Sequence, residues 1–108
     1  MKIYTSDYLY YGKNRLDITV KGQDILGQYF APSWRMVKDF KSGKITEDEY
    51  IKKYDKILNS ITKPVWRKLY DLDDVVLVCF CKKGNFCHRI LLAKRIVQDK
   101  MGEYLGEI

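Results

Sequence analysis

Cysteine, histidine and arginine stand side by side at Cys87, His88 and Arg89, and these residue types can carry out nucleophilic and acid–base chemistry. Cysteine attacks as its thiolate, which is favoured where a helix begins and where cationic groups lie nearby. His88 is the only histidine of the chain, so a mechanism that needs two histidines is excluded. If a ligand is processed here, we expect Cys87 to be the nucleophile or His88 the base, with Arg89 holding negative charge.

The residues around this triplet predict a binding site for an anion. Lys82 and Lys83 precede Gly84 and Asn85 in a short turn, and Arg89 follows in the first turn of a predicted helix. The N-terminus of a helix offers unpaired N–H groups and a partial positive charge, which attract phosphate or carboxylate. Gly84 would permit close backbone approach, and Asn85 is suited to cap the helix. The alternative is an ordinary surface loop that carries lysines.

Cys79, Cys81, Cys87 and His88 also form a potential set of zinc ligands. Their spacing does not match the two pairs of ligands that structural zinc sites usually show. We therefore predict no metal site and no cofactor, and keep a zinc or redox role of the cysteines as an alternative. Cys79 lies inside an apolar run and is expected to be a packing residue, with Cys81 intermediate. Three clustered cysteines argue against a disulfide framework and favour a reducing cytoplasm.

Two elements must position these residues. The apolar run at 75–80 predicts a strand covered on both faces, as in the interior of a parallel sheet. Apolar residues at three- and four-residue steps from 86 to 101 predict a helix, and open α/β folds bind ligands in the loop between such elements. A first strand at 2–5 ends at Thr5 and Ser6. Their hydroxyl groups would reach the same mouth if the two strands are neighbours.

The rest of the chain predicts an α/β fold. A second strand is expected at 16–20, helices at 34–41, after Thr46 and from Pro64, and an edge strand or a loose tail at 103–108. We predict one domain over residues 1–108, a single-domain sandwich in which a small, mostly parallel sheet is covered by three to four helices. The helical insert covers about 32–70.

Composition favours anionic partners. The net charge is +6, and nine tyrosines supply amphipathic rings. A nucleic-acid-binding accessory protein is the alternative, less favoured because the basic residues are spread over several predicted helices and no recognised nucleic-acid-binding motif is present. No apolar run of membrane-spanning length and no signal-peptide pattern occur, so we expect a cytoplasmic protein without a membrane partner.

The stretch VVLVCFCKKGNFCHRILLA at 75–93 resembles the signature of domain-of-unknown-function family 488, in which an apolar strand, a cysteine and a turn precede Cys-His-Arg and a helix. Pro32 with Ser33 and Trp34, and the opening IYTSDY, agree with that resemblance. It implies a cytoplasmic α/β sandwich of bacterial or phage type, without a settled activity. The recurrent residues of the family would fall on Ser6, Pro32, Cys79, Cys87, His88 and Arg89.

Together these observations predict that the strand–turn–helix at 79–89 binds an anionic, nucleotide-like small molecule. Thr5, Ser6, Lys82, Lys83, Gly84, Asn85 and Arg89 are the expected ligand-binding residues. Tyr8, Tyr10 and Tyr11 could stack on a base. The sequence leaves open whether the ligand is turned over or only held, in which case the protein would sequester a nucleotide signal.

Overall fold

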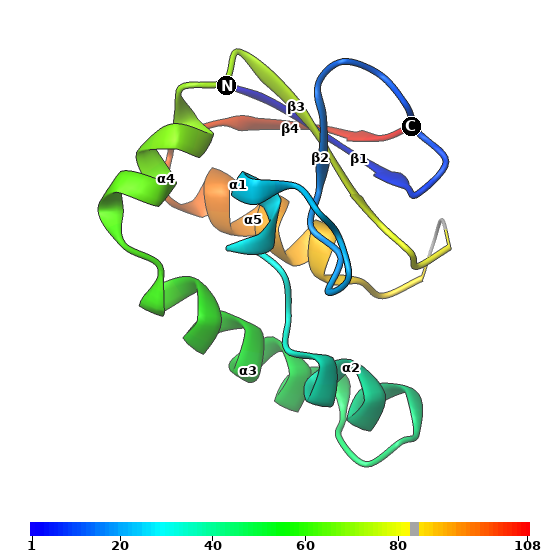
Figure 1. Cartoon of the computed structure of the whole chain (residues 1–108). Coiled ribbons are helices and arrows are strands. Elements are labelled where there is room, and N and C mark those ends of the chain that lie inside the picture. Colours follow the sequence, from blue (N-terminus) through cyan, green and yellow to red (C-terminus); the bar gives the residue numbers. More distant parts are fainter. Residues whose placement is uncertain (83–84) are drawn as a thin grey trace.

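We describe a computed structural model of the chain, which covers residues 1–82 and 85–108 (Figure 1). The elements follow in the order β1 (Lys2–Asp7), β2 (Arg15–Asp17), α1 (Ile25–Gln28), α2 (Trp34–Lys41), α3 (Glu47–Ser60), α4 (Lys63–Tyr70), β3 (Asp74–Cys79), α5 (His88–Gln98) and β4 (Glu103–Glu107). The predicted α/β fold is confirmed. No helix in the described ranges is long and apolar enough to span a membrane.

The strands form a parallel sheet in the order β2-β3-β1-β4. Strand β3 lies between β2 and β1, with Leu77 opposite both Leu16 and Thr5. The predicted first and central strands are therefore neighbours. Because all pairs are parallel, β1, β2 and β3 end at the same edge of the sheet, which is where parallel α/β folds usually bind ligands. The tail at 103–108 forms the edge strand β4.

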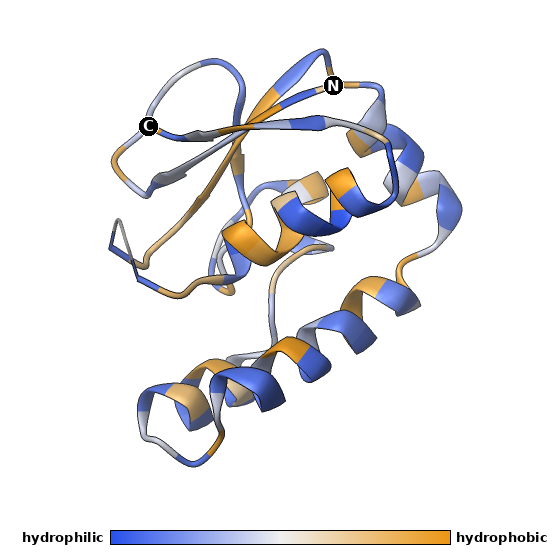
Figure 2. Ribbon diagram, turned by 180° about the vertical axis from the view of Figure 1, so that it is seen from behind, coloured by the Kyte–Doolittle hydropathy of each residue, from blue (hydrophilic) through white to orange (hydrophobic). Residues whose placement is uncertain are grey.

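The helices lie in layers on one side of the sheet, with α5 against the strands and α3 beyond α5 (Figures 1 and 2). Orange, apolar segments mark β3 and much of α5 in Figure 2, whereas α3 carries long blue stretches. Apolar side chains from all layers meet in one core, which includes Ile3, Leu77, Tyr54, Leu58, Leu92 and Ile96. Burial of this apolar surface is the main force that holds the helices on the sheet.

The other face of β3 is covered by the loop after β1 rather than by a helix. Val76 and Val78 are buried on that face, and the ring of Tyr8 stacks on Phe80 with centroids 4.3 Å apart. The guanidinium of Arg15 lies over the Tyr8 ring at 4.4 Å. Strand β3 is thus buried on both faces as predicted, but it ends at Cys79. Phe80 is 60% exposed, so extending the strand to this residue was wrong.

Helix α3 begins as the sequence predicts. The Thr46 hydroxyl accepts from the Glu49 backbone N–H, and the Glu49 carboxylate accepts from the Thr46 N–H, which completes a capping box. The predicted helices at 34–41 and from Pro64 are also present as α2 and α4. With α3 and the short α1, they form the connection from β2 to β3.

Three further predicted boundaries were wrong. The first strand continues to Asp7 instead of ending at Thr5 and Ser6. The second strand stops at Asp17 instead of Val20, because the Asp17 carboxylate accepts hydrogen bonds from the Thr19 N–H and hydroxyl and turns the chain. Helix α5 starts at His88 with Cys87 as its N-cap, and the Cys87 side chain makes no capping hydrogen bond. Asn85, which was expected to be the cap, lies two residues before that position.

Tyr54 on α3 ties the outer layer to the core and generates the first prediction. Its hydroxyl donates to the Phe30 carbonyl at 2.7 Å, with both residues fully buried. Tyr54→Phe should therefore lower the free energy of unfolding by about 1–2 kcal/mol, because the Phe30 oxygen is left unpaired. Tyr11→Phe is the matched control, because Tyr11 is 79% exposed. It should change the free energy of unfolding by less than about 0.5 kcal/mol.

The same pair of variants tests the effect of pH. Burial raises the pKa of Tyr54 well above its usual value of 10.0, so the folded protein keeps this tyrosine neutral where the unfolded chain ionises it. The contribution of Tyr54 is thus complete below pH 10 and is lost as pH rises further. Urea unfolding of both variants and the wild type, at neutral pH and above pH 10, should show the Tyr54→Phe deficit shrinking. A deficit that is unchanged above pH 10 contradicts the prediction.

Candidate functional site

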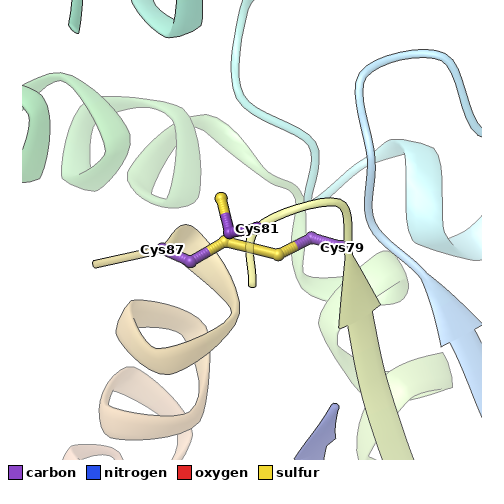
Figure 3. A group of neighbouring side chains, drawn as sticks. All are labelled: Cys79, Cys81 and Cys87. Carbon is purple, nitrogen blue, oxygen red and sulfur yellow. A yellow bond between two sulfur atoms is a disulfide. The ribbon is translucent and has the colours of Figure 1, made fainter. Parts of the chain in front are cut away.

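Three sulfur atoms gather where β3 ends and α5 begins. Cys79 is the last residue of β3, Cys81 follows two residues later, and Cys87 is the N-cap of α5. Their Sγ atoms all lie within 4.8 Å of one another (Figure 3). Cys79 and Cys87 form a disulfide, and Cys81 is a free, partly exposed thiol. The sequence interpretation did not foresee this bond, and in the disulfide form Cys87 has no thiol to act as a nucleophile.

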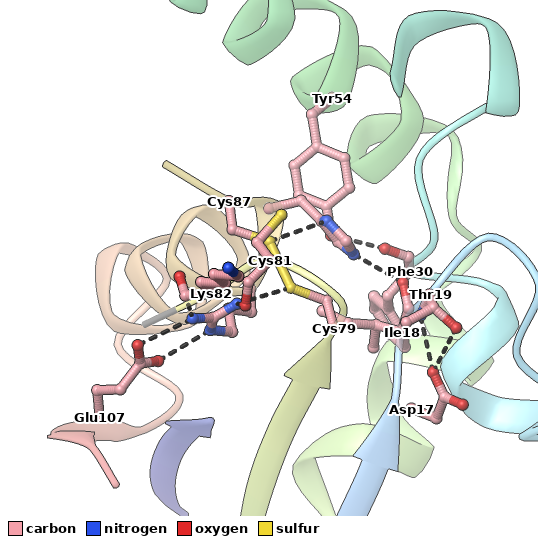
Figure 4. Close-up of a disulfide and its surroundings, with 12 residues drawn as sticks. Asp17, Ile18, Thr19, Phe30, Tyr54, Cys79, Cys81, Lys82, Cys87 and Glu107 are labelled. Carbon is pink, nitrogen blue, oxygen red and sulfur yellow. Dashed lines mark hydrogen bonds and ion pairs between the residues drawn. A yellow bond between two sulfur atoms is a disulfide. The ribbon is translucent and has the colours of Figure 1, made fainter. Parts of the chain in front are cut away.

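Arg89 is fully buried, and its guanidinium donates to the Glu107 side chain and to the segment that carries the cysteines. Figure 4 labels these partners. Nε and Nη2 donate to the Glu107 carboxylate at 2.8 and 2.9 Å, which joins α5 to β4. Nη1 donates to Cys79 Sγ and to the Cys81 carbonyl, both at 2.9 Å. Burial by itself would lower the pKa of Arg89, but the hydrogen bond and charge of Glu107 outweigh it and raise the pKa.

His88 is buried and neutral. Its Nε2 atom lies 2.7 Å from the Ile18 carbonyl oxygen, and its ring packs edge-to-face on Tyr54. Burial lowers the pKa of His88 to about 4, against the smaller opposing effect of the bond to Ile18. Because a carbonyl only accepts, Nε2 carries the proton. The lone pair of Nδ1 is then left facing Cys87 Sγ, 3.6 Å away.

A cavity of about 1000 Å³ opens beside the cysteines and His88. Lys21, Lys41 and Lys82 contribute its charged side chains, and the part of its wall that the structure describes contains no aspartate or glutamate. The three lysines come from the loop after β2, the end of α2 and the loop after β3. Because no acidic group neutralises them in that wall, the cavity favours a negatively charged occupant.

Aromatic side chains form much of the remaining wall. Phe40, Tyr50 and Phe86 contact one another with ring centroids 5.2–5.4 Å apart. Trp34 is half exposed at the cavity, and the Lys21 ammonium lies 4.8 Å from its ring centroid. Planar rings beside cations suit a ligand that has both a planar ring, which can stack on the aromatic side chains, and a negatively charged group, which the lysines attract.

A comparison with protein families identifies the chain. The model described as the active DUF488-N3 subclade, DUF488-N3a, matches residues 5–100. The chain belongs to the DUF488 family. No curated protein and no solved structure is significantly similar to it.

In this DUF488 protein, the structure brings only part of the predicted site to the cavity. Lys82, Asn85, Cys87 and His88 line it, together with Cys79 and Cys81. Arg89 is absent from the described wall, because its donors face Glu107 and the loop backbone. Lys83 and Gly84, two further predicted ligand-binding residues, lie outside the described part of the chain.

The side chains of Thr5 and Ser6 contact the C-terminal segment, at Tyr104 and Ile108, rather than the cavity. Thr5 Oγ1 lies 2.6 Å from the Tyr104 hydroxyl, and the Ser6 hydroxyl donates to the Ile108 carbonyl at 3.2 Å. Neither residue belongs to the described wall of the cavity. The two strands are neighbours, which was the condition for this expectation, but their pairing does not bring these hydroxyl groups to the same opening as the cysteines.

The tyrosines expected to stack on a base are engaged elsewhere. Tyr8 stacks on Phe80 on the far face of β3, and the Tyr10 hydroxyl donates to Asn14. The aromatic rings that line the cavity come from α2, from α3, from the segment before α5 and from Phe80 itself, which follows β3. In the sequence these residues appear only as apolar positions of predicted helices and of the predicted central strand, which carry no signal of a binding role.

The Arg89–Glu107 pair generates a second prediction. Glu107→Ala leaves a fully buried guanidinium without its counter-charge, so the free energy of unfolding should fall by on the order of 3 kcal/mol. Asp99→Ala is the matched control, because it breaks the exposed Arg95–Asp99 pair. It should lower the free energy of unfolding by less than about 0.5 kcal/mol. Denaturant unfolding of both variants checks this. An equal fall in the free energy of unfolding in both variants would contradict the prediction that burial makes the Arg89–Glu107 pair more stabilising than the Arg95–Asp99 pair.

Proposed function

We propose that this DUF488 protein binds an anionic, nucleotide-like small molecule in the cavity beside its cysteine cluster. The observation that carries the proposal is the composition of the wall: three lysines and several aromatic rings, with no acidic side chain in its described part. The cavity also adjoins the carboxyl end of β3, the usual position of ligand sites in parallel α/β folds.

The three lysines support the anionic half of the ligand. Lys21, Lys41 and Lys82 are exposed at the opening, so their ammonium groups can reach an incoming phosphate without first leaving a buried ion pair. Lysine binds phosphate as a flexible point charge. Arg89, the cation that the sequence favoured, acts from behind the cavity by holding the loop after β3 through the Cys81 carbonyl.

The aromatic wall and the size of the cavity support the planar half of the ligand. The half-exposed ring of Trp34 offers a face on which a base could stack, and Phe40 and Phe86 lie among the other apolar lining residues. A volume of about 1000 Å³ is at the upper end of typical small-molecule sites and is large enough for a nucleotide.

The cysteines and His88 would supply chemistry if the ligand is turned over. Once the disulfide is reduced, the Cys87 thiol lies beside the lone pair of His88 Nδ1, which can accept a hydrogen bond from the thiol and orient it. The description of the matching family model as active favours turnover. With the disulfide closed, the protein holds its ligand without reacting, which corresponds to sequestration of a nucleotide signal.

Binding measurements with matched ligands test this function. Thermal shift and calorimetry would compare nucleoside monophosphates, ADP-ribose and cyclic dinucleotides with the uncharged nucleosides and with inorganic phosphate. We expect the phosphorylated nucleosides to stabilise the protein most, because only they engage both the lysines and the rings. Absence of stabilisation by every compound would contradict the proposal.

Lysine variants locate the site. Lys82→Ala and Lys41→Ala should each weaken binding about fivefold, roughly 1 kcal/mol, through loss of one cation at the cavity. Lys52→Ala on the exposed face of α3 is the matched control and should leave the affinity unchanged. An equal loss in all three variants would point to general attraction of polyanions, as the nucleic-acid alternative predicts, and would count against a specific cavity.

A further inference from the structure

We infer that the reduced protein binds a thiophilic divalent metal ion, of the Zn²⁺ type, through Cys79, Cys81 and Cys87. The three Sγ atoms lie within 4.8 Å of one another. A tetrahedral zinc ion with Zn–S distances of about 2.3 Å holds its sulfur atoms about 3.8 Å apart. Once the bond between Cys79 and Cys87 is opened, small side-chain rotations bring all three sulfurs to that spacing.

The backbone leaves room for an ion between the two bonded cysteines. Their Cα atoms are 7.8 Å apart, whereas disulfides usually join Cα atoms separated by roughly 4.4–6.8 Å. Two thiolates that share a metal ion are held further apart than two sulfurs in a covalent bond. Cys79 at the end of a strand and Cys87 at the start of a helix are both fixed by regular structure, so this separation is built into the fold.

The surroundings of Cys79 and Cys87 stabilise thiolates, whereas burial raises the pKa of the Cys81 thiol. Arg89 Nη1 donates to Cys79 Sγ at 2.9 Å, and Cys87 stands at the N-terminus of α5, where the helix dipole favours negative charge. Hydrogen bonds to ligating atoms orient them and tune the metal. Since three thiolates and a divalent ion carry one net negative charge, the buried Arg89 guanidinium is a suitable neighbour for the loaded site.

The fourth coordination position would face the cavity. All three cysteines belong to the cavity wall, and His88 lies just behind Cys87 with its Nε2 proton held by the Ile18 carbonyl. Three protein ligands with one open position are the pattern of catalytic rather than structural zinc sites. The ion would thus sit where a molecule in the cavity could reach it, although its binding does not depend on the nucleotide-like ligand proposed above.

The disulfide and the metal require the same sulfurs, so they exclude each other. Oxidation of the Cys79 and Cys87 thiolates removes two electrons, forms the S–S bond and leaves Cys81 as a single ligand. Diamide is a suitable oxidant, because it accepts these two electrons with two protons from water and becomes the corresponding hydrazine. Diamide-treated protein is therefore a metal-free reference with unchanged sequence.

Cobalt and zinc titrations of tag-free protein, reduced under anaerobic conditions, test the inference. We expect about one equivalent of Co²⁺ to bind with the thiolate charge-transfer band and the visible bands of a tetrahedral site, and Zn²⁺ to displace it. Less than about a tenth of an equivalent bound by reduced wild type would overturn the inference. Metal binding by the diamide-treated protein equal to that of the reduced protein would overturn it as well.

Variants assign the ligands. Cys81→Ser keeps the other two thiols and alters a partly exposed side chain, so it should fold and lose more than about 100-fold in affinity. His88→Gln changes a residue behind the ligands and should lose only about 10–100-fold. Circular dichroism of each variant checks the fold. If Cys81→Ser binds as tightly as wild type, the three-cysteine site is wrong, whereas nucleotide binding measured with a chelator present reports separately on the proposed function.

Discussion

The buried guanidinium of Arg89 is the constraint on which the site depends. A cation removed from water needs close partners, and Arg89 finds them on β4, at the end of β3 and in the loop that follows β3. These bonds fix the direction in which the chain leaves the sheet and the point at which α5 begins. The positions of Cys79 and Cys87, and the distance between them, follow from that fixed geometry.

The cavity results from the way the helical connection is packed. All strands run in parallel, so β2 and β3 must be joined by a long crossover, which here contains α1 to α4. Figure 1 shows α2 and α3 at a distance from the sheet, beyond α5. Rings from α2 and α3 meet Phe86 near the cysteines, and lysines from two loops and from the end of α2 lie at the opening.

Much of the fold could be predicted because its signals are local. The apolar run of β3, the capping box at Thr46 and the periodicity of α5 all depend on residues near one another in the chain. Errors occurred where a side chain competes with the backbone, as at Asp17, or where a helix begins without a side-chain cap, as at Cys87. These boundaries depend on which hydrogen-bond partners the backbone finds, and the periodicity of apolar residues does not indicate those partners.

By itself the sequence determined the α/β class, the family and the segment that holds the cysteines, because each of these is written in adjacent residues. Only the tertiary structure decided that Arg89 faces inward to Glu107, that Thr5 and Ser6 bond to the C-terminal segment, and that three sulfurs converge. It also placed Lys21, Lys41 and Trp34 around one cavity. The direction of a side chain depends on how the helices and strands pack. Packing brings together residues that are far apart in the chain, and no local sequence pattern indicates that they will be in contact.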